Sequence, residues 1–358
     1  MSRLLPRPST SDAATPRVRG MRRATRFALG LAFAATLVLS VGTAPSLASV
    51  GSVYFDANGN VGAGETLFGS LTTGSGNVGL GDLVMPNLTT GFDNIAAGDR
   101  ALEANTSGHN NIATGTGALQ ANTGGNDNAA AGFHALSSNT TGSNNVAAGT
   151  NALERNTTGS NNVATGIQAL PTNTTGHDNI ATGSNALRGN GGGHDNLAAG
   201  TAALFWNSTG NNNLAAGSQA LYFNTTGNGN LANGFNALLN NTTGSSNVAL
   251  GSGAGTNLTS GSNNIDIANA GVAGEAGKIR IGTNGKQTAA FLAGVSGQAI
   301  PGPVKTVVIN ANGRLGTKPP SAKLKANTIS ARVTSLSRQL RRQAQMIRQL
   351  RRKVSARH

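Results

Sequence analysis

The sequence contains no cysteine, which excludes a disulfide-stapled module as well as cysteine-ligated zinc and cysteine redox chemistry. Aromatic residues are also scarce, at 4% of the chain, and charged residues make up only 11%. Glycine is in excess, with 51 residues among 358, which is about twice the average share. Such a composition cannot fill a thick globular core, so we expect the chain to fold by stacking a small unit many times.

The few charges are distributed unevenly along the chain. The formal charge is +6 over residues 1–48, −9 over residues 49–275 and +17 over residues 276–358, which gives the net charge of +14. The last of these segments contains no acidic residue. The net charge therefore describes three different segments rather than one uniformly basic protein.

An apolar run at residues 27–41 follows three arginines and precedes the sequence SLA, which ends at Ala48. This order is typical of a secretory signal peptide, so we predict that residues 1–48 are removed and that the mature chain is secreted or held at the cell surface. A transmembrane anchor is the alternative, but the run is shorter than the roughly 20 residues that span a bilayer. The stretch before the run is unusually long, which makes Met21 a second candidate for the initiator.

The middle of the chain repeats with a period of 17 residues. An asparagine followed by an apolar residue recurs thirteen times from Asn60 to Asn264, and no step contains an insertion or a deletion. Around this anchor asparagine the consensus is G-x-x-N-[VIL]-A-x-G-x-x-A-L-x-x-N-T-T. A period without length variation indicates that each repeat is one turn of a solenoid, because an insertion would break the stacking of equivalent side chains.

Each turn is expected to be of the β type, since a helix pair needs about 33 residues and every repeat carries several Gly, Asn or Thr residues. We expect two short strands and two turns per repeat. The aliphatic residue after the anchor and the A-L pair should point inward, and the N-T-T-G stretch should form a corner. The parallel β-roll is predicted over residues 58–275, after an N-terminal cap at residues 49–57. Thirteen turns at about 4.8 Å each would form a rod on the order of 60 Å long.

The anchor asparagine has a predicted structural role. Stacked in register, its amide can donate to the amide of the next turn, and such a ladder would satisfy polar groups otherwise buried in the roll. The repeated glycines would allow positive φ or a close approach of neighbouring backbones. The ladder residues predicted for the central turns are Asn94, Asn111, Asn145, Asn162, Asn179, Asn196 and Asn213.

Other polar residues of the repeat match functional motifs but fit turn positions better. Triplets such as the NTT that begins at Asn139 match the glycosylation sequon, which a corner of this composition contains anyway. Aspartate precedes the anchor in only four repeats, and the nine-residue period of calcium rolls is absent. His109, His177 and His194 share one turn position, and we interpret them as surface residues rather than as a metal site. No cofactor or metal is therefore predicted.

The repeats, for example GSNNVATGIQALPTNTTG, resemble the head repeats of trimeric autotransporter adhesins. They resemble still more closely the 17-residue variant found ahead of tail-fibre chaperone domains in bacterial and phage proteins. The resemblance covers residues 58–268. It implies a left-handed parallel β-roll, the association of three rolls into a homotrimer, and a surface-exposed rod that binds a host or surface ligand.

After the repeats, residues 276–320 are predicted to form a small β connector. Alternating apolar residues at 278–281, 288–293 and 304–309, separated by Gly and Pro, indicate three or four short strands. The stretches AFLAGVSGQAI and VVINANGRLGT resemble the connector that precedes the self-cleaving chaperone domain of the tail-fibre proteins.

The candidates for catalysis, Ser321 and Lys325, follow this connector. In the chaperone family a serine and a lysine four residues later follow an L-G-T element, and the chain cuts itself beside the serine; Ser321 and Lys325 stand at that spacing. A lysine can act as a base toward a serine only if burial lowers its pKa. Only 33 residues follow Lys325, far fewer than the chaperone domain of the family contains, so we expect autoproteolysis to be lost and the chain to be non-enzymatic.

Residues 321–358 are predicted to form a basic coiled-coil helix. Apolar residues recur there at alternating spacings of four and three, which is a heptad seam. Because the same chain must supply the partner helices, the seam favours a homo-oligomer. The resemblance of the 17-residue repeats to the heads of trimeric adhesins implies that this oligomer is a trimer. The seam positions are Ile329, Val333, Leu336, Leu340, Gln343, Ile347, Leu350 and Val354.

The flanks of this helix carry basic residues without an acid to pair with them. In a trimer this like charge is destabilising unless an anionic partner screens it, such as an anionic cell-envelope polymer or a lipid surface. The alternatives are a soluble arginine-rich coiled coil and a contact with the acidic rod. Nucleic acid ranks last, because no aromatic residue interleaves with the arginines. The candidate polyanion-binding residues are Arg338, Arg341, Arg342, Arg348, Arg351, Arg352 and Lys353.

Three functions remain open from the sequence. The first is an exported, non-enzymatic fibrous surface protein that is adhesin-like or tail-fibre-like. The second is a self-processing remnant of a tail-fibre-type chaperone that uses Ser321 and Lys325. The third is a polyanion-binding module of the cell envelope. The repeat and the composition favour the first.

Overall fold

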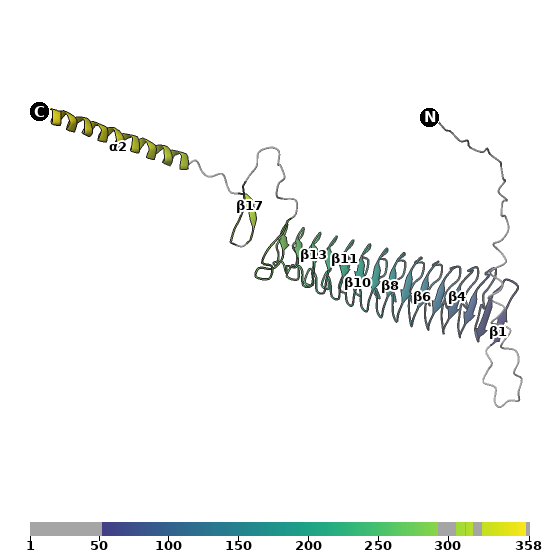
Figure 1. Cartoon of the computed structure of the whole chain (residues 1–358). Helices are drawn as coiled ribbons and strands as arrows, with labels where there is room; N and C mark the ends of the chain where they lie inside the picture. Colours follow the sequence, from purple (N-terminus) through teal and green to yellow (C-terminus); the bar gives the residue numbers. More distant parts are fainter. Residues whose placement is uncertain (1–51, 293–305, 312, 318–323, 356–358) are drawn as a thin grey trace, which may run out of the picture. The chain divides into compact units, whose positions relative to one another are not determined.

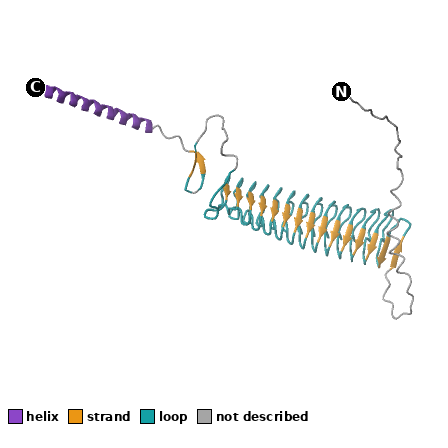
Figure 2. Cartoon of the chain, viewed as in Figure 1, coloured by secondary structure: helices purple, strands orange, loops and turns teal. Residues whose placement is uncertain are grey.

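The structure is a computed structural model of the whole chain, shown in Figures 1 and 2. It divides into two units that meet between Gln287 and Thr288, and each is described by itself. The predicted signal peptide, residues 1–48, lies outside the described residues. The residues that the structure describes are 52–292, 306–311, 313–317 and 324–355.

The first unit is a rod of stacked turns built on one long sheet (Figure 1). Strands that follow one another in the sequence are neighbours in the sheet. Most pairs are parallel and join equivalent residues 17 positions apart, for example Val146 and Val163. The strands are β1 (Ser52–Phe55), β2 (Val61–Gly64), β3 (Val78–Leu80), β4 (Ile95–Ala97), β5 (Ile112–Thr114), β6 (Ala129–Ala131), β7 (Val146–Ala148), β8 (Val163–Thr165), β9 (Ile180–Thr182), β10 (Leu197–Ala199), β11 (Leu214–Ala216), β12 (Leu231–Asn233), β13 (Val248–Leu250), β14 (Ile265–Ile267) and β15 (Ile279–Ile281).

The rod confirms the predicted β-solenoid of 17-residue turns, but each turn contributes one strand to the sheet instead of two. The other side of the turn contains residues with positive φ, which interrupt a regular strand. One of them is the core leucine, as in Leu153 with a φ of 50°. Backbone hydrogen bonds still join successive turns on this side, for example from the Leu153 N–H to the Ala169 carbonyl oxygen at 3.0 Å. Both sides of the turn are therefore stacked through the backbone.

The aliphatic residue after the anchor asparagine points outward, so the prediction that it fills the core is wrong. In β7, Val146 is 41% exposed, whereas Ala147 is only 1% exposed. Side chains alternate across a strand, and the asparagine before Val146 already takes the inward position. The next residue must then face outward, and the alanine after it faces the core.

The core of the rod is narrow and is built mainly from alanine and leucine. Each central turn buries one alanine from its strand and an A-L pair from the other side, such as Ala147, Ala152 and Leu153. Alanine has little volume, which lets the two sides of the turn approach closely. Among the described residues, Phe68 near the start of the rod is the only aromatic side chain in this core, which agrees with the low aromatic content of the chain.

Different structures close the two ends of the rod. At the start, β1 pairs antiparallel with β2, and the rings of Tyr54 and Phe68 pack with centroids 5.1 Å apart. At the other end, β15 pairs parallel with β14, although Ile279 follows Ile265 by 14 residues instead of 17. The strand predicted at 278–281 thus continues the sheet of the rod.

The second unit contains a hairpin and a helix, which Figure 2 shows in orange and purple. In the hairpin, β16 (Val307–Ile309) pairs antiparallel with β17 (Leu315–Thr317), and the helix α2 spans Leu324–Ser355. The strand predicted at 288–293 is wrong for its described part, residues 288–292. These residues are exposed, so nothing buries the alternating apolar face that a strand there would need. Among the described residues, no helix has the length and apolarity needed to cross a bilayer.

Candidate functional surfaces

The thirteen anchor asparagines form a continuous buried ladder from Asn60 to Asn264, which we call the first ladder. Asn162 shows its bonds: the Nδ2 group and the backbone N–H both donate to Oδ1 of Asn145, at 3.1 and 3.0 Å. The Nδ2 group of Asn162 also donates to the Gly176 carbonyl oxygen at 2.9 Å. The predicted ladder is therefore confirmed, with an additional bond from the backbone of each turn. The predicted members, all 2% exposed or less, are Asn94, Asn111, Asn145, Asn162, Asn179, Asn196 and Asn213.

A second ladder, which the sequence did not lead us to predict, joins the asparagines at the N-T-T position of the consensus from Asn105 to Asn241. The Nδ2 group of Asn156 donates to Oδ1 of Asn139 at 2.7 Å and to the Gly159 carbonyl oxygen at 2.9 Å. The N-T-T-G stretch was predicted to form a corner of the turn, and these asparagines are fully buried there. Their recurrence at the same 17-residue spacing was the available signal, since it also predicts contact between equivalent amides.

The two ladders meet at shared glycine carbonyls. The Gly142 carbonyl oxygen accepts hydrogen bonds from Nδ2 of Asn128 in the first ladder and Nδ2 of Asn139 in the second, both at 2.9 Å. This arrangement satisfies amides that would otherwise be costly to bury. The asparagine of the glycosylation sequon at Asn139 is 0% exposed, so its side chain is not accessible for modification in the folded rod.

Asp56 completes the first ladder at its N-terminal end. Its Oδ1 accepts the backbone N–H of Asn60, and its Oδ2 accepts Nδ2 of Asn60, both at 2.9 Å. Burial acts to raise the pKa of the Asp56 carboxyl, but hydrogen bonds from Asn60, Tyr54 and Asn58 outweigh it and hold that pKa below its ordinary value. An ionised carboxylate thus replaces the amide of a preceding turn.

The C-terminal end of the rod buries a carboxyl without a hydrogen bond. Asp266 takes the inward strand position that alanine holds in the central turns, and neither of its oxygens has a partner. The pKa of Asp266 is raised to about 6, mainly by burial and also by nearby Glu275, against the lowering effect of Arg280. Arg280 is paired with Asp266 in the sheet, but its guanidinium bonds to Glu275 instead, at 2.6 Å. The last turn of the rod is therefore sensitive to protonation.

The stacking of turns also brings histidines together. The rings of His177 and His194 lie parallel with centroids 4.8 Å apart, and each Nδ1 lies within 2.8 Å of the carboxylate of the next residue, Asp178 or Asp195. His109 stacks on a phenylalanine instead. In the part of the chain that the structure describes, no group of three or more His, Cys, Asp or Glu side chains is arranged to hold a metal.

The outward residues after the anchor asparagines form an apolar line along the rod, which we call the outer stripe. It is continuous because the strands pair in register, and residues such as Ile112 and Ile180 are 46% and 42% exposed. Extended apolar surface of this kind commonly marks an interaction site. The members of the outer stripe are Val61, Val78, Ile95, Ile112, Ala129, Val146, Val163, Ile180, Leu197, Leu214, Leu231, Val248 and Ile265.

The predicted catalytic pair stays a prediction. Ser321 lies outside the described residues. For Lys325 the structure describes the backbone alone, which lies in the first turn of α2.

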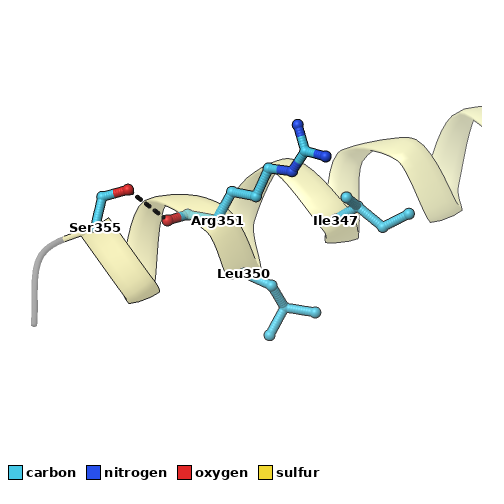
Figure 3. Close-up of a pocket in the computed structure, with 4 residues that line it drawn as sticks. All are labelled: Ile347, Leu350, Arg351 and Ser355. Atoms are coloured by element: carbon cyan, nitrogen blue, oxygen red, sulfur yellow. Dashed lines mark hydrogen bonds between the residues drawn. The ribbon is translucent and has the colours of Figure 1, made fainter.

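The helix α2 exposes both its apolar seam and its basic residues. The described apolar seam residues are between 53% and 67% exposed. Figure 3 shows Ile347, Leu350, Arg351 and Ser355, which line a pocket on the surface of this one helix. The candidate polyanion-binding residues, all exposed on α2, are Arg338, Arg341, Arg342, Arg348, Arg351, Arg352 and Lys353.

Comparison of the chain with models of known protein families, with curated proteins and with solved structures finds no match. The resemblance of the repeats to adhesin heads and tail-fibre proteins therefore remains an expectation and establishes no family membership. What the protein does has to be inferred from the rod, the outer stripe and α2.

Proposed function

We propose that this protein is an exported, non-enzymatic fibrous protein that displays its rod at a cell surface for attachment or recognition. The uninterrupted stack of 17-residue turns, joined by two buried asparagine ladders, carries this proposal. A stack that repeats the same contacts in every turn is suited to length and stiffness. The apolar run and small residues that end at Ala48 support export.

Assembly into a homotrimer is part of the proposal. The apolar seam of α2 is more than half exposed in the single chain, and the outer stripe exposes aliphatic side chains along the rod. Both surfaces are unfavourable in water unless other copies cover them. A narrow seam with two positions in seven is the pattern of a coiled coil. The resemblance to trimeric adhesin heads favours three chains.

Light scattering of the full chain tests this assembly. We expect a mass of three times the single-chain 35.7 kDa, less the signal peptide where it has been removed. Deletion of residues 329–358 should lower the mass to that of a single chain or make it depend on concentration, because the seam is lost. A full-length chain that stays monomeric at high concentration would remove the trimer and most of the analogy with adhesins.

The basic end of the trimer is proposed to bind an anionic polymer of the cell envelope. The 32 residues of α2 contain no acid, and its arginines are exposed. Three such helices side by side would repel one another unless an anion screens them. Affinity for heparin or teichoic acid should disappear when residues 329–358 are deleted and should weaken steeply with salt. Binding that survives the deletion would place the anion site elsewhere.

A self-processing protein is the alternative from another class, and intact-mass analysis separates the two. The proposal expects an unbroken chain after the signal peptide. A break between Pro320 and Ser321 that the substitution Ser321→Ala abolishes would overturn the non-enzymatic role.

A further inference from the structure

Aromatic residues gather at one place on the rod. The chain has one tryptophan, two tyrosines and ten phenylalanines, and four of these residues stand on two successive turns as Phe205-Trp206 and Tyr222-Phe223. They occupy the two positions between the core leucine and the second-ladder asparagine, where the other central turns carry mostly small, polar or charged residues. We call these four side chains the aromatic patch.

The aromatic patch has two inner rings and two outer rings. Phe205 and Tyr222 are stacked, with centroids 4.9 Å apart and an interplanar angle of 12°. Trp206 meets Phe205 edge-on at 5.0 Å, and Phe223 meets Tyr222 edge-on at 4.7 Å. The stacked pair thus braces both outer rings, which remain 49% and 42% exposed. Packing within the rod explains why Phe205 and Tyr222 are aromatic, because they stack on each other. It does not explain why two large aromatic rings, Trp206 and Phe223, remain exposed beside them.

A small residue and polar residues border the aromatic patch, together with Leu239, which follows Tyr222 by one turn. Gly189 occupies the position of Trp206 in the preceding turn, so no side chain covers the tryptophan from that position. A Cβ at Gly189 would lie 2.9 Å from the Phe205 carbonyl oxygen, so a side chain there would require a local shift. The guanidinium carbon of Arg188 lies 5.3 Å from the Phe205 ring centroid. On the other side, Asn240 is exposed at the position that follows Phe223 by one turn, and its Nδ2 group donates to the Thr256 carbonyl oxygen at 2.8 Å. Its Oδ1 atom is the group offered to a hydroxyl.

We propose that the aromatic patch binds a neutral saccharide chain, whose sugar rings stack on Trp206 and Phe223 and whose hydroxyls bond to Arg188 and Asn240. A sugar ring has an apolar C–H face, which packs on the electron-rich face of an aromatic ring, and a rim of hydroxyls. Successive turns are spaced by about 4.8 Å, close to the length of one sugar unit, so adjacent sugars can each meet one ring. The inference deepens the proposed recognition role and rests on it.

Other occupants fit the aromatic patch less well. A nucleic acid also stacks bases on aromatic rings, but residues 49–275 carry a charge of −9 that repels a polyanion. A second copy of the chain would be expected on a more continuous apolar surface, which the outer stripe offers at another position of the turn. The polar residues at the edges instead match a ligand that is apolar on its face and polar at its rim.

Trp206 is the sole tryptophan of the chain, so its fluorescence reports on this site directly. The full-length protein is titrated with chitohexaose, cellohexaose and maltohexaose, and labelled protein is applied to a glycan array. We expect a saturable change of emission with at least one of the three hexaoses. Phe223→Ala should weaken that binding about tenfold, since it removes one stacked ring but keeps the tryptophan. Phe235→Ala, which removes a phenylalanine 55% exposed elsewhere on the turn, is the matched control and should leave affinity unchanged.

Three results would overturn the inference. The first is no response to any hexaose or array glycan by protein whose circular dichroism and melting are normal. The second is an equal loss of binding in Phe223→Ala and Phe235→Ala. The third is an emission that shifts with protein concentration alone, which would assign the aromatic patch to a contact between copies. Light scattering on the same sample keeps the two proposals apart, because a trimer that binds no saccharide contradicts only this inference.

Discussion

Breaking one rung of the first ladder should destabilise the rod more than breaking one rung of the second. Oδ1 of Asn162 accepts both the backbone N–H and Nδ2 of Asn179, at 3.1 Å each. Oδ1 of Asn156, in the second ladder, accepts Nδ2 of Asn173 at 2.8 Å and no backbone N–H. The substitution Asn162→Ala therefore leaves two buried N–H bonds of Asn179 without an acceptor, one on the backbone and one on Nδ2, whereas Asn156→Ala leaves one N–H bond of Asn173.

The magnitudes follow from the cost of a buried donor without a partner, which is about 1–3 kcal/mol. We expect Asn162→Ala to lower the free energy of unfolding by about 2–6 kcal/mol and Asn156→Ala by about 1–3 kcal/mol. The glycine carbonyl oxygens that accept from the deleted amide are less affected than the N–H groups, because each keeps a second hydrogen bond. The Gly176 carbonyl oxygen, for example, loses the bond from Asn162 but keeps the one from Asn173, at 2.9 Å.

Urea denaturation followed by circular dichroism measures both variants against the unchanged protein. The substitution is the same in the two ladders, so the loss of side-chain volume is matched and the difference reports on hydrogen bonds. Equal midpoints for the two variants, or a lower midpoint for Asn156→Ala, would refute the assignment of the backbone bond to the first ladder alone.

The close turn-to-turn contacts, the core leucines and the buried carboxyl give three further tests. Gly149 has a φ of 141°, and a Cβ there would lie 2.5 Å from the Gly166 carbonyl oxygen, so Gly149→Ala should prevent folding or lower the melting temperature strongly. Gly124→Ala, whose Cβ would come no nearer than 3.5 Å to another residue, should lower the free energy of unfolding by less than about 1 kcal/mol. Equal melting temperatures for the Gly149→Ala and Gly124→Ala variants would contradict this reasoning. Leu153→Ala should cost about 2–5 kcal/mol in urea, and a cost below that range would show that the leucine column is not the core. Because the pKa of Asp266 is raised to about 6 from an ordinary 3.8, the folded end of the rod binds a proton more tightly than the unfolded chain. The contribution of Asp266 to the stability of this end should be fully present below pH ~4 and should be lost, on the order of 3 kcal/mol, as the pH rises through ~6. Hydrogen exchange at β14 should show this loss, and Asp266→Ala should abolish it; the same pH profile in the variant would contradict the assignment to Asp266.

The sequence predicted the parts of the fold that depend on period alone. A 17-residue step without insertions requires equivalent residues to stack. The recurrence of the anchor asparagine from Asn60 to Asn264 therefore predicted both the solenoid and the first ladder. The direction of each side chain did not follow. Once the asparagine takes an inward position, Val146 has to face outward, and the period does not reveal which of the two neighbours is buried.

The second ladder and the aromatic patch were missed for another reason. Asparagine in an N-T-T-G stretch is a common turn residue, so the 17-residue recurrence of Asn139 and its equivalents was interpreted as a repeated corner. The structure shows that Asn139 is buried and that its Nδ2 group donates to the Gly142 carbonyl oxygen. The aromatic patch was visible as Phe205-Trp206 and Tyr222-Phe223 at identical positions of successive repeats. Its meaning depends on which rings remain exposed, and that requires the stacked structure.

The central claim is that each 17-residue turn is an equivalent unit of one stack, and a pair of deletions tests it most directly. Removing residues 146–162 takes out one complete turn, so Asn145 meets Asn179 and Asn139 meets Asn173 with both ladders intact. Removing residues 146–160 instead shifts every later turn by two residues. We predict that the first deletion unfolds in one transition like the unchanged protein and gives a rod about 4.8 Å shorter by small-angle scattering, whereas the second is much less stable. Equal stability of the two deletions would contradict the claim.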